Sequence, residues 1–277
     1  MRMFLSPAES ANLRRALMTG LTALLMAQEN DFILPASWSL FAVDGLYNIY
    51  GWDKEARALY KLWAPRYDSL TRIGGVPGME GFLDVTAIAP LGNQQVYVLD
   101  PAGQKVFLLG TNLQPLQRLS YDQLPTEVVE GYPVLLAARE SGELYLLLRE
   151  TQEIVKIDAF GRVILRFGGK IYGVGSISGA AGLYAEGDRV YVVDTVQHRL
   201  IEYDSWGSFI QEEHFPDTVQ GVFPCQAGKA LWGGNQITWK GKIEQTFSAS
   251  EPVRAVWVQN QRLYWIGKRR GGWFLIP

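Results

Sequence analysis

The sequence predicts an all-β fold, a six-bladed β-propeller of four-stranded antiparallel blades, and two observations carry this prediction. A short apolar strand with a central tyrosine recurs along the chain at intervals of 33 to 48 residues. A second apolar strand follows most copies at a constant offset of ten residues. A period of about 43 residues is typical of propeller blades, whereas a β-sandwich has no reason to repeat that offset.

The recurring strand defines six units along the chain. Its copies lie at 49–53, 96–100, 144–147, 190–194 and 263–266, with a degenerate copy at 230–233. The strand ten residues later is centred on Tyr60, Phe107, Val155, Ile201 and Phe274, and Ile237 takes this place in a shortened fifth unit. An apolar stretch precedes each tyrosine, and turn signals at 158–161 and 204–207 separate the third strand from a fourth.

The two ends of the chain predict how the ring closes. The last unit stops at its third strand, in residues 272–277. Residues 31–35, Asp-Phe-Ile-Leu-Pro, precede the first strand of the first unit and have no other role in the pattern. We therefore expect an N-terminal strand to complete the last blade, which would leave no open sheet edge between the two ends.

The domain organisation follows from this pattern. Arg14 and Arg15 precede about twelve apolar or small residues that end at Ala27, which predicts a signal peptide over 1–27. Residues 28–277 then form one propeller that works in the periplasm, outside the cell or at the envelope. The blades are expected at roughly 37–74, 82–120, 132–168, 180–213, 219–248 and 252–277 plus 31–35.

Composition narrows the function classes. The net charge is −2, so no basic excess indicates nucleic acid, and no membrane-spanning segment is expected once the signal is removed. A single cysteine, Cys225, excludes an intrachain disulfide and is interpreted as an inert thiol. Two histidines, His198 and His214, are too few for a zinc site of the usual histidine-rich kind.

One unit carries a family resemblance. Residues 167–175 read Phe-Gly-Gly-Lys-Ile-Tyr-Gly-Val-Gly, and the strands 189–194 and 197–201 and the turn 204–207 follow. This unit resembles an NHL repeat, and the whole layout is similar to six-bladed envelope propellers of Bacteroidota. The resemblance implies a structural role for two charge pairs at the ends of adjacent strands, Asp194 with Arg199 and Asp100 with Lys105.

No catalytic motif, metal site or binding site can be assigned from these residues. The leading hypothesis is therefore a non-catalytic binding or scaffolding propeller of the cell envelope with a protein partner. The alternative is a propeller hydrolase or lyase with an oxygen-ligated metal in the channel, and a small-molecule or glycan sensor is a third reading. No cofactor is predicted, although oxygen-bearing residues in loops leave Ca²⁺ open. An aromatic channel mouth would favour binding, and an acidic one would favour an enzyme.

Overall fold

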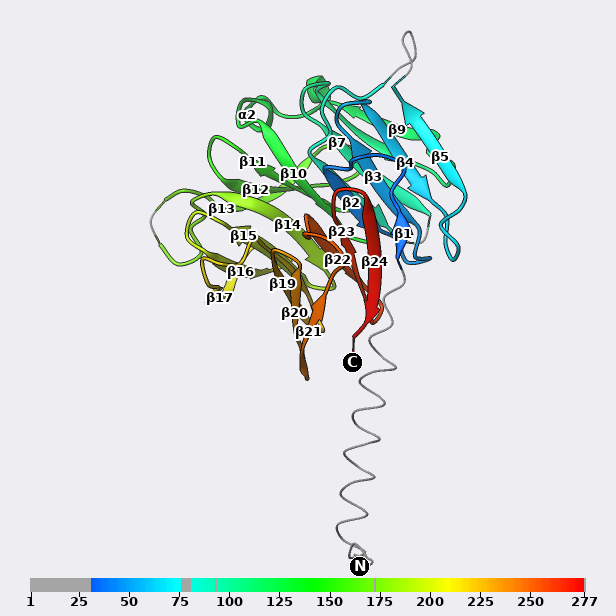
Figure 1. Ribbon diagram of the computed structural model, residues 1–277. Helices are drawn as coiled ribbons and strands as arrows, with labels where there is room; N and C mark the ends of the chain where they lie inside the picture. The colour runs from blue at the N-terminus through cyan, green and yellow to red at the C-terminus, as the bar shows by residue number, and fades with distance from the viewer. Residues whose placement is uncertain (1–30, 76–80, 93, 172, 277) are drawn as a thin grey trace, which may run out of the picture.

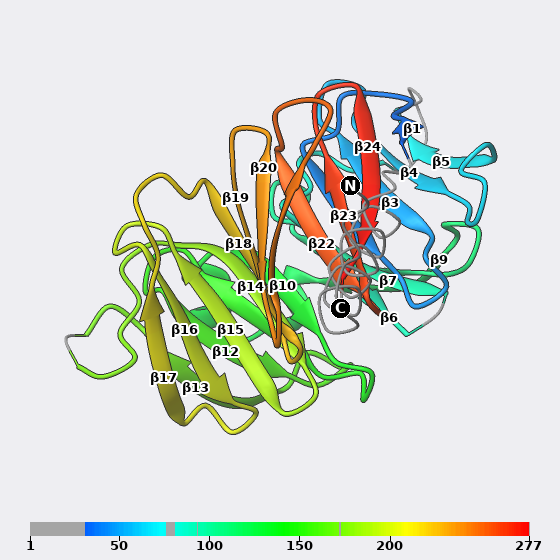
Figure 2. The ribbon, with the colours of Figure 1, turned by 60° about the horizontal axis from the view of Figure 1, so that its bottom comes forward.

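The computed structural model describes residues 31–75, 81–92, 94–171 and 173–276, and these form six four-stranded antiparallel sheets. The predicted signal peptide at 1–27 lies outside the described residues. The sheets surround a common axis as the blades of a propeller, which confirms the predicted fold class. In Figure 2, the innermost strands β10, β14, β18 and β22 lie toward the middle of the molecule, and the outermost strands β5, β9 and β17 lie at its periphery.

Blades 1 to 5 are meanders whose strands run outward from the axis in sequence order, and blade 6 takes its outermost strand from the N-terminal segment. Blade 1 contains β2 (Leu40–Val43), β3 (Ile49–Asp53), β4 (Ala58–Leu62) and β5 (Leu70–Gly74). Blade 2 contains β6 (Ala87–Leu91), β7 (Gln95–Asp100), β8 (Lys105–Leu109) and β9 (Pro115–Ser120). Blade 3 contains β10 (Pro133–Ala138), β11 (Leu144–Leu148), β12 (Glu153–Ile157) and β13 (Val163–Gly168).

The second half of the chain repeats this plan. Blade 4 contains β14 (Ala180–Glu186), β15 (Arg189–Asp194), β16 (Arg199–Asp204) and β17 (Phe209–His214). Blade 5 contains β18 (Gly221–Cys225), β19 (Gly228–Gly233), β20 (Gln236–Lys240) and β21 (Glu244–Ser248). Blade 6 contains β22 (Ala255–Gln259), β23 (Arg262–Ile266), β24 (Arg270–Leu275) and β1 (Phe32–Ile33). The fifth unit, which the sequence predicted as shortened, therefore has four strands like the others.

Strand β1 closes the ring as predicted. Phe32 pairs with Gly271 and Ile33 with Arg270, so the N-terminal strand is the outermost strand of blade 6 (Figure 1). Gly271 leaves room for this pairing, because a Cβ on it would lie 2.6 Å from the ring of Phe32. The closure therefore combines backbone hydrogen bonds with a buried aromatic side chain.

The core consists of six clusters of buried apolar side chains, one at each interface between neighbouring blades. The middle strands β3 and β11 are buried at every position, since both faces of a blade are covered by its neighbours. Among the described residues, helical structure is confined to a 3₁₀ turn at Tyr121–Gln123 and to α2 (Thr126–Glu130), both between blades 2 and 3. In the described part of the chain, no helix has the length and apolar character needed to cross a bilayer.

Candidate functional site

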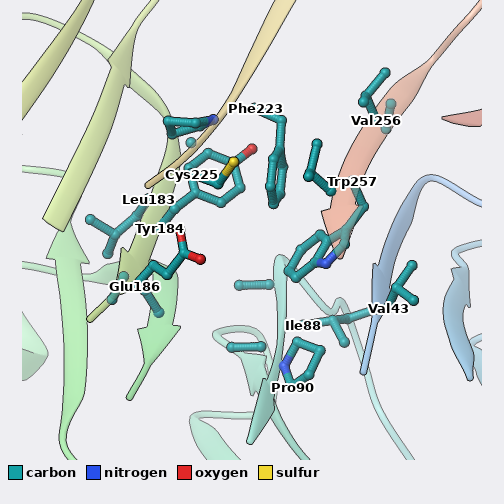
Figure 3. A pocket seen from close by; sticks show the side chains of 18 of the residues that line it. Val43, Ile88, Pro90, Leu183, Tyr184, Glu186, Phe223, Cys225, Val256 and Trp257 are labelled. Atoms are coloured by element: carbon teal, nitrogen blue, oxygen red, sulfur yellow. The ribbon is translucent and has the colours of Figure 1, made fainter. Parts of the chain in front are cut away.

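A cavity of about 780 Å³ lies between the innermost strands of the six blades. Every blade contributes to its wall, so the cavity is the central channel of the propeller. Most of the side chains labelled in Figure 3 are apolar or aromatic, and the labelled residues come from blades 1, 2, 4, 5 and 6. Pockets that bind small molecules are commonly built this way, with a few polar groups set in an apolar wall.

One register position divides this channel into two halves. In each blade, one residue of the innermost strand pairs with the central residue of the second strand. In blades 1 to 3 this residue is alanine, and the pairs are Ala42 with Tyr50, Ala89 with Tyr97, and Ala137 with Tyr145. In blades 4 to 6 it is aromatic, and the pairs are Tyr184 with Tyr191, Phe223 with Ala230, and Trp257 with Tyr264. We call Ala42, Ala89 and Ala137 the alanine half and Tyr184, Phe223 and Trp257 the aromatic half.

The three rings of the aromatic half contact one another across the blade interfaces. The Tyr184 and Phe223 ring centroids lie 4.7 Å apart in an edge-to-face arrangement. Those of Phe223 and Trp257 lie 4.8 Å apart, and those of Tyr184 and Trp257 lie 6.4 Å apart. Phe223 is buried, whereas Tyr184 and Trp257 remain partly exposed. The three residues therefore form one aromatic cluster with two rings still accessible.

Local sequence explains how these rings fit. Gly182 lies two residues before Tyr184, and a Cβ on Gly182 would come within 2.8 Å of the Tyr184 ring. In blade 5 the residue on the second strand is small: Phe223 pairs with Ala230, whereas in the other five blades the equivalent pair contains a tyrosine on the second strand. The degenerate tyrosine motif of the fifth unit therefore makes space for the ring of Phe223.

Two polar side chains lie beside the aromatic half. Glu186 ends strand β14, is exposed, and accepts a hydrogen bond from the backbone N–H of Gln226. Cys225 ends strand β18 and is half-buried; burial, and then the charge of Glu186, raise the pKa of its thiol to about 11. The thiol is therefore protonated near neutral pH, in agreement with its interpretation as an inert cysteine. Burial also raises the pKa of Tyr184 to about 12.

Two more polar atoms in the channel wall are buried without a hydrogen-bond partner among the described residues. They are Nε1 of Trp257 and Oγ1 of Thr86. An unpaired buried donor costs free energy unless another group meets it. Both atoms are enclosed in the wall, so they do not present a hydrogen-bonding group at the channel surface.

The charge pair Asp194 and Arg199 lies away from this cavity wall, on β15 and β16. Asp194 is fully buried and accepts hydrogen bonds from the backbone N–H groups of Ser178 and Gly179, at 2.9 and 3.1 Å, and of Val196 and Gln197. Arg199 forms an ion pair with Asp194 at 3.3 Å and donates to the carbonyl of Ser176 at 2.7 Å. These contacts join the strand ends to the segment that leads into β14.

Asp100 occupies the equivalent place in blade 2. It is buried and accepts hydrogen bonds from the backbone N–H groups of Leu83, Asp84 and Gly103 at 2.8 to 3.0 Å. Lys105 is its register partner on β8. Both aspartates therefore hold the segment that enters the innermost strand, a contact that the sequence pattern did not indicate.

The remaining candidate residues do not gather into a centre. His198 and His214 lie on blade 4, where their nearest carboxylates are those of Asp217 at 3.9 Å and Glu212 at 4.0 Å. Asp44 is buried and is occupied by hydrogen bonds from Asn48 and Tyr50. Within the described residues, no three histidine, cysteine, aspartate or glutamate side chains are placed to hold a metal ion.

Sequence analysis did not single out Tyr184 or Trp257 as functional residues. The pattern showed only that an apolar stretch precedes each tyrosine. Aligning the six units on the strand-pairing partner of each central tyrosine would have shown the alanine and aromatic positions side by side. The tertiary structure supplies this register directly.

No protein-family model and no curated protein matches the sequence. Solved structures resemble it in fold. A catalytically inactive virginiamycin B lyase from Staphylococcus aureus with quinupristin has a TM-score of 0.56 and 11% identity, over 85% of this chain and 80% of that one. BBS1N in complex with ARL6DN has a TM-score of 0.55 and 15% identity, over 90% and 97%.

A third match covers only part of a longer chain. PorZ, an essential bacterial surface component of the type-IX secretion system of Porphyromonas gingivalis, has a TM-score of 0.55 and 12% identity. The match covers 88% of this chain and 32% of PorZ. At such identities the three likenesses show the β-propeller fold alone, and that fold serves enzymes and partner-binding modules alike.

Proposed function

We propose that this chain is a non-catalytic binding propeller of the cell envelope with a protein partner. The observation that carries the proposal is the wall of the channel, where three aromatic rings converge and no group of three potential metal ligands lies among the described residues. Propeller enzymes require acid–base groups or metal ligands at this place. An aromatic wall instead supplies contact area and cation–π interactions, which serve binding.

A second feature supports a protein partner. Phe160 and Trp206 occupy the same turn between the third and fourth strands of blades 3 and 4, and they are 74% and 76% exposed. An aspartate side chain fixes each turn. Asp158 accepts a hydrogen bond from the backbone N–H of Phe160, and Asp204 accepts one from the backbone N–H of Trp206. Tryptophan is enriched among the residues that dominate protein interfaces. Two rigidly presented rings on neighbouring blades suit such a contact.

The envelope location rests on the predicted signal peptide. The NHL-like pattern of residues 167–207 and the similarity to envelope propellers of Bacteroidota are part of the same proposal. PorZ offers a precedent, because it is a propeller-containing surface component of a bacterium. In this reading the propeller docks a partner outside the cytoplasm.

A capture experiment tests the proposal. The purified chain is used to isolate partners from an envelope fraction, beside a Phe160→Ala/Trp206→Ala variant. Ile33→Ala serves as the control, since Ile33 is 80% exposed on another blade. We expect a reproducible partner that the double variant loses and the control keeps. Failure to recover any partner would count against docking, and stoichiometric Ca²⁺ with a chelator-sensitive melt would favour the hydrolase or lyase alternative.

A further inference from the structure

We propose that the aromatic half of the channel, together with Glu186, binds an organic cation such as a quaternary ammonium group. This inference rests on the proposed binding function and names the chemistry of the ligand. It comes from the difference between blades 1 to 3 and blades 4 to 6 at one register position of the innermost strand.

The rings provide a surface that attracts cations. Tyr184, Phe223 and Trp257 converge with centroid separations of 4.7 to 6.4 Å, and two of the rings stay partly exposed to the channel. The face of an aromatic ring carries partial negative charge, so clustered rings attract ammonium groups, and most strongly where water is displaced. Figure 3 shows the three side chains around one part of the cavity.

The charge beside the rings is negative. Glu186 borders the same part of the cavity as Tyr184 and Cys225 (Figure 3), and the described residues place no lysine or arginine in an ion pair with it. Arg139 in the lining is paired with Glu143 at 3.2 Å, and Glu143 also pairs with Lys156 at 2.7 Å. Arg254, which also lines the cavity, donates a hydrogen bond to Ser37 Oγ at 3.1 Å. The exposed Glu140 adds a second carboxylate to the lining. A ligand cation would therefore gain Coulomb attraction here, whereas an anion would be repelled.

The cavity of about 780 Å³ provides the space. Ala42, Ala89 and Ala137 hold the register positions at which the other three blades carry rings. Ala89 and Ala137 line the cavity, whereas Ala42 is buried in the cluster between blades 1 and 2, against which Trp257 also packs. The small side chains of blades 2 and 3 suit a ligand with a cationic head against the rings and a body that extends across the cavity.

Matched probes test the charge requirement. Choline and its neutral isostere 3,3-dimethylbutan-1-ol have the same shape but differ by one positive charge, and benzyltrimethylammonium adds a ring. Isothermal titration calorimetry on the full chain should detect choline, tighter benzyltrimethylammonium and at least tenfold weaker binding of the neutral alcohol. Equal affinity for choline and the alcohol, or binding of neither cation at millimolar concentration, would overturn the proposal.

Two substitutions test the residues. Glu186→Gln and Trp257→Leu should each weaken benzyltrimethylammonium binding by about threefold to thirtyfold, the range for a cation–π or comparable electrostatic contact. Glu150→Gln is the matched control, because Glu150 is exposed and does not line the channel. Glu186→Gln changes no buried group, so it stays informative if Trp257→Leu folds poorly. An unchanged affinity of Glu186→Gln for benzyltrimethylammonium would show that Glu186 does not contribute to cation binding.

Cys225 offers an independent readout. It is the only cysteine of the chain and lines the channel beside Glu186. Benzyltrimethylammonium should slow alkylation of Cys225 by iodoacetamide at pH 9 at least threefold in the wild type, with little protection in Glu186→Gln. Protection by the neutral alcohol to the same extent would contradict a cation site.

The source of the cation and the proposed docking function are tested separately. If benzyltrimethylammonium releases the captured envelope partner, the partner supplies the cationic group as a side chain. If capture persists while the probe binds, the channel takes a free small molecule. If capture succeeds and no cation binds, the docking function stands and the channel proposal fails.

Discussion

The interface between blades 6 and 1 and the interface between blades 4 and 5 are built differently. The first is filled by a large apolar cluster that includes Trp38, Phe41 and Tyr264, together with Phe32 and Leu34 from the N-terminal segment. The second has a small buried cluster in the described residues, namely Val193, Phe215, Val222 and Leu231. A polar cleft of about 500 Å³ also lies between blades 4 and 5.

This difference shows where the ring depends on packing and where it does not. Blade 6 joins the two ends of the chain without a covalent bond, and a dense core supports that junction. Blades 4 and 5 are bridged by polar contacts, such as the Lys229–Glu213 ion pair and the bond from Gln226 to Glu186. Exposed polar contacts contribute little stability. Pro224 and Cys225 line both the polar cleft and the channel.

The largest expected effect breaks the closure. Phe32→Ala combined with Leu34→Ala should lower the free energy of unfolding by about 5 kcal/mol or more, since each removes a buried side chain from the blade 6–1 interface. Ile33→Ala is the control, because Ile33 lies on the same strand but is exposed. Thermal unfolding followed by circular dichroism checks this. Equal melting temperatures for the double variant and the control would mean that β1 does not hold the ring.

The next effect concerns blade 4, which borders the weakly packed interface. We propose that Asp194 and Arg199 brace this blade internally, as Asp100 and Lys105 brace blade 2. Asp194→Ala should cost about 3 kcal/mol, because it leaves backbone donors and Arg199 without their buried acceptor. Asp100→Ala should cost about 2 kcal/mol, because fewer donors lose their acceptor.

Denaturant unfolding measures both losses in stability. Asp188→Ala is the control, since its side chain is 69% exposed and its loss should cost less than about 0.5 kcal/mol. A cost for Asp194→Ala no larger than that of the control would refute the bracing role. A cost equal to that of Asp100→Ala would show that the number of donors left without an acceptor does not set the loss of stability.

The smallest effect compares the apolar clusters directly. Leu263→Ala, in the dense blade 5–6 cluster, should cost about 3 kcal/mol, which is the usual range for a fully buried leucine. Leu231→Ala, in the small blade 4–5 cluster, should cost about 1.5 kcal/mol, because the adjacent cleft lets water or neighbouring side chains fill the space. Equal costs from denaturant unfolding would show that the two interfaces are equally packed.

Much of the fold could be predicted from local patterns. The number of blades follows from the recurring tyrosine strand, and the closing strand follows from the unpaired apolar residues 31–35, both of which the structure confirms. The antiparallel meander makes this possible, because each strand pairs with its neighbour in sequence. The sequence also placed Asp194 and Arg199 at facing strand ends, where they are register partners.

The candidate site could not be predicted in the same way. Tyr184, Phe223 and Trp257 belong to three blades, and each looks like an ordinary apolar residue of a buried strand. Similarly, nothing local distinguishes Val222 in a thin interface from Val256 in a dense one.

The sequence by itself determined the repeating unit, the number of blades and the strand that joins the ends, because hydrogen bonds within a meander link segments that are close along the chain. The tertiary structure alone decided that three aromatic rings converge at the channel wall, where the equivalent positions of the other three blades carry alanine. It also decided which blade interface is the thinnest. Both properties arise from contacts between blades, and such contacts depend on the register and the side-chain volumes of distant strands together.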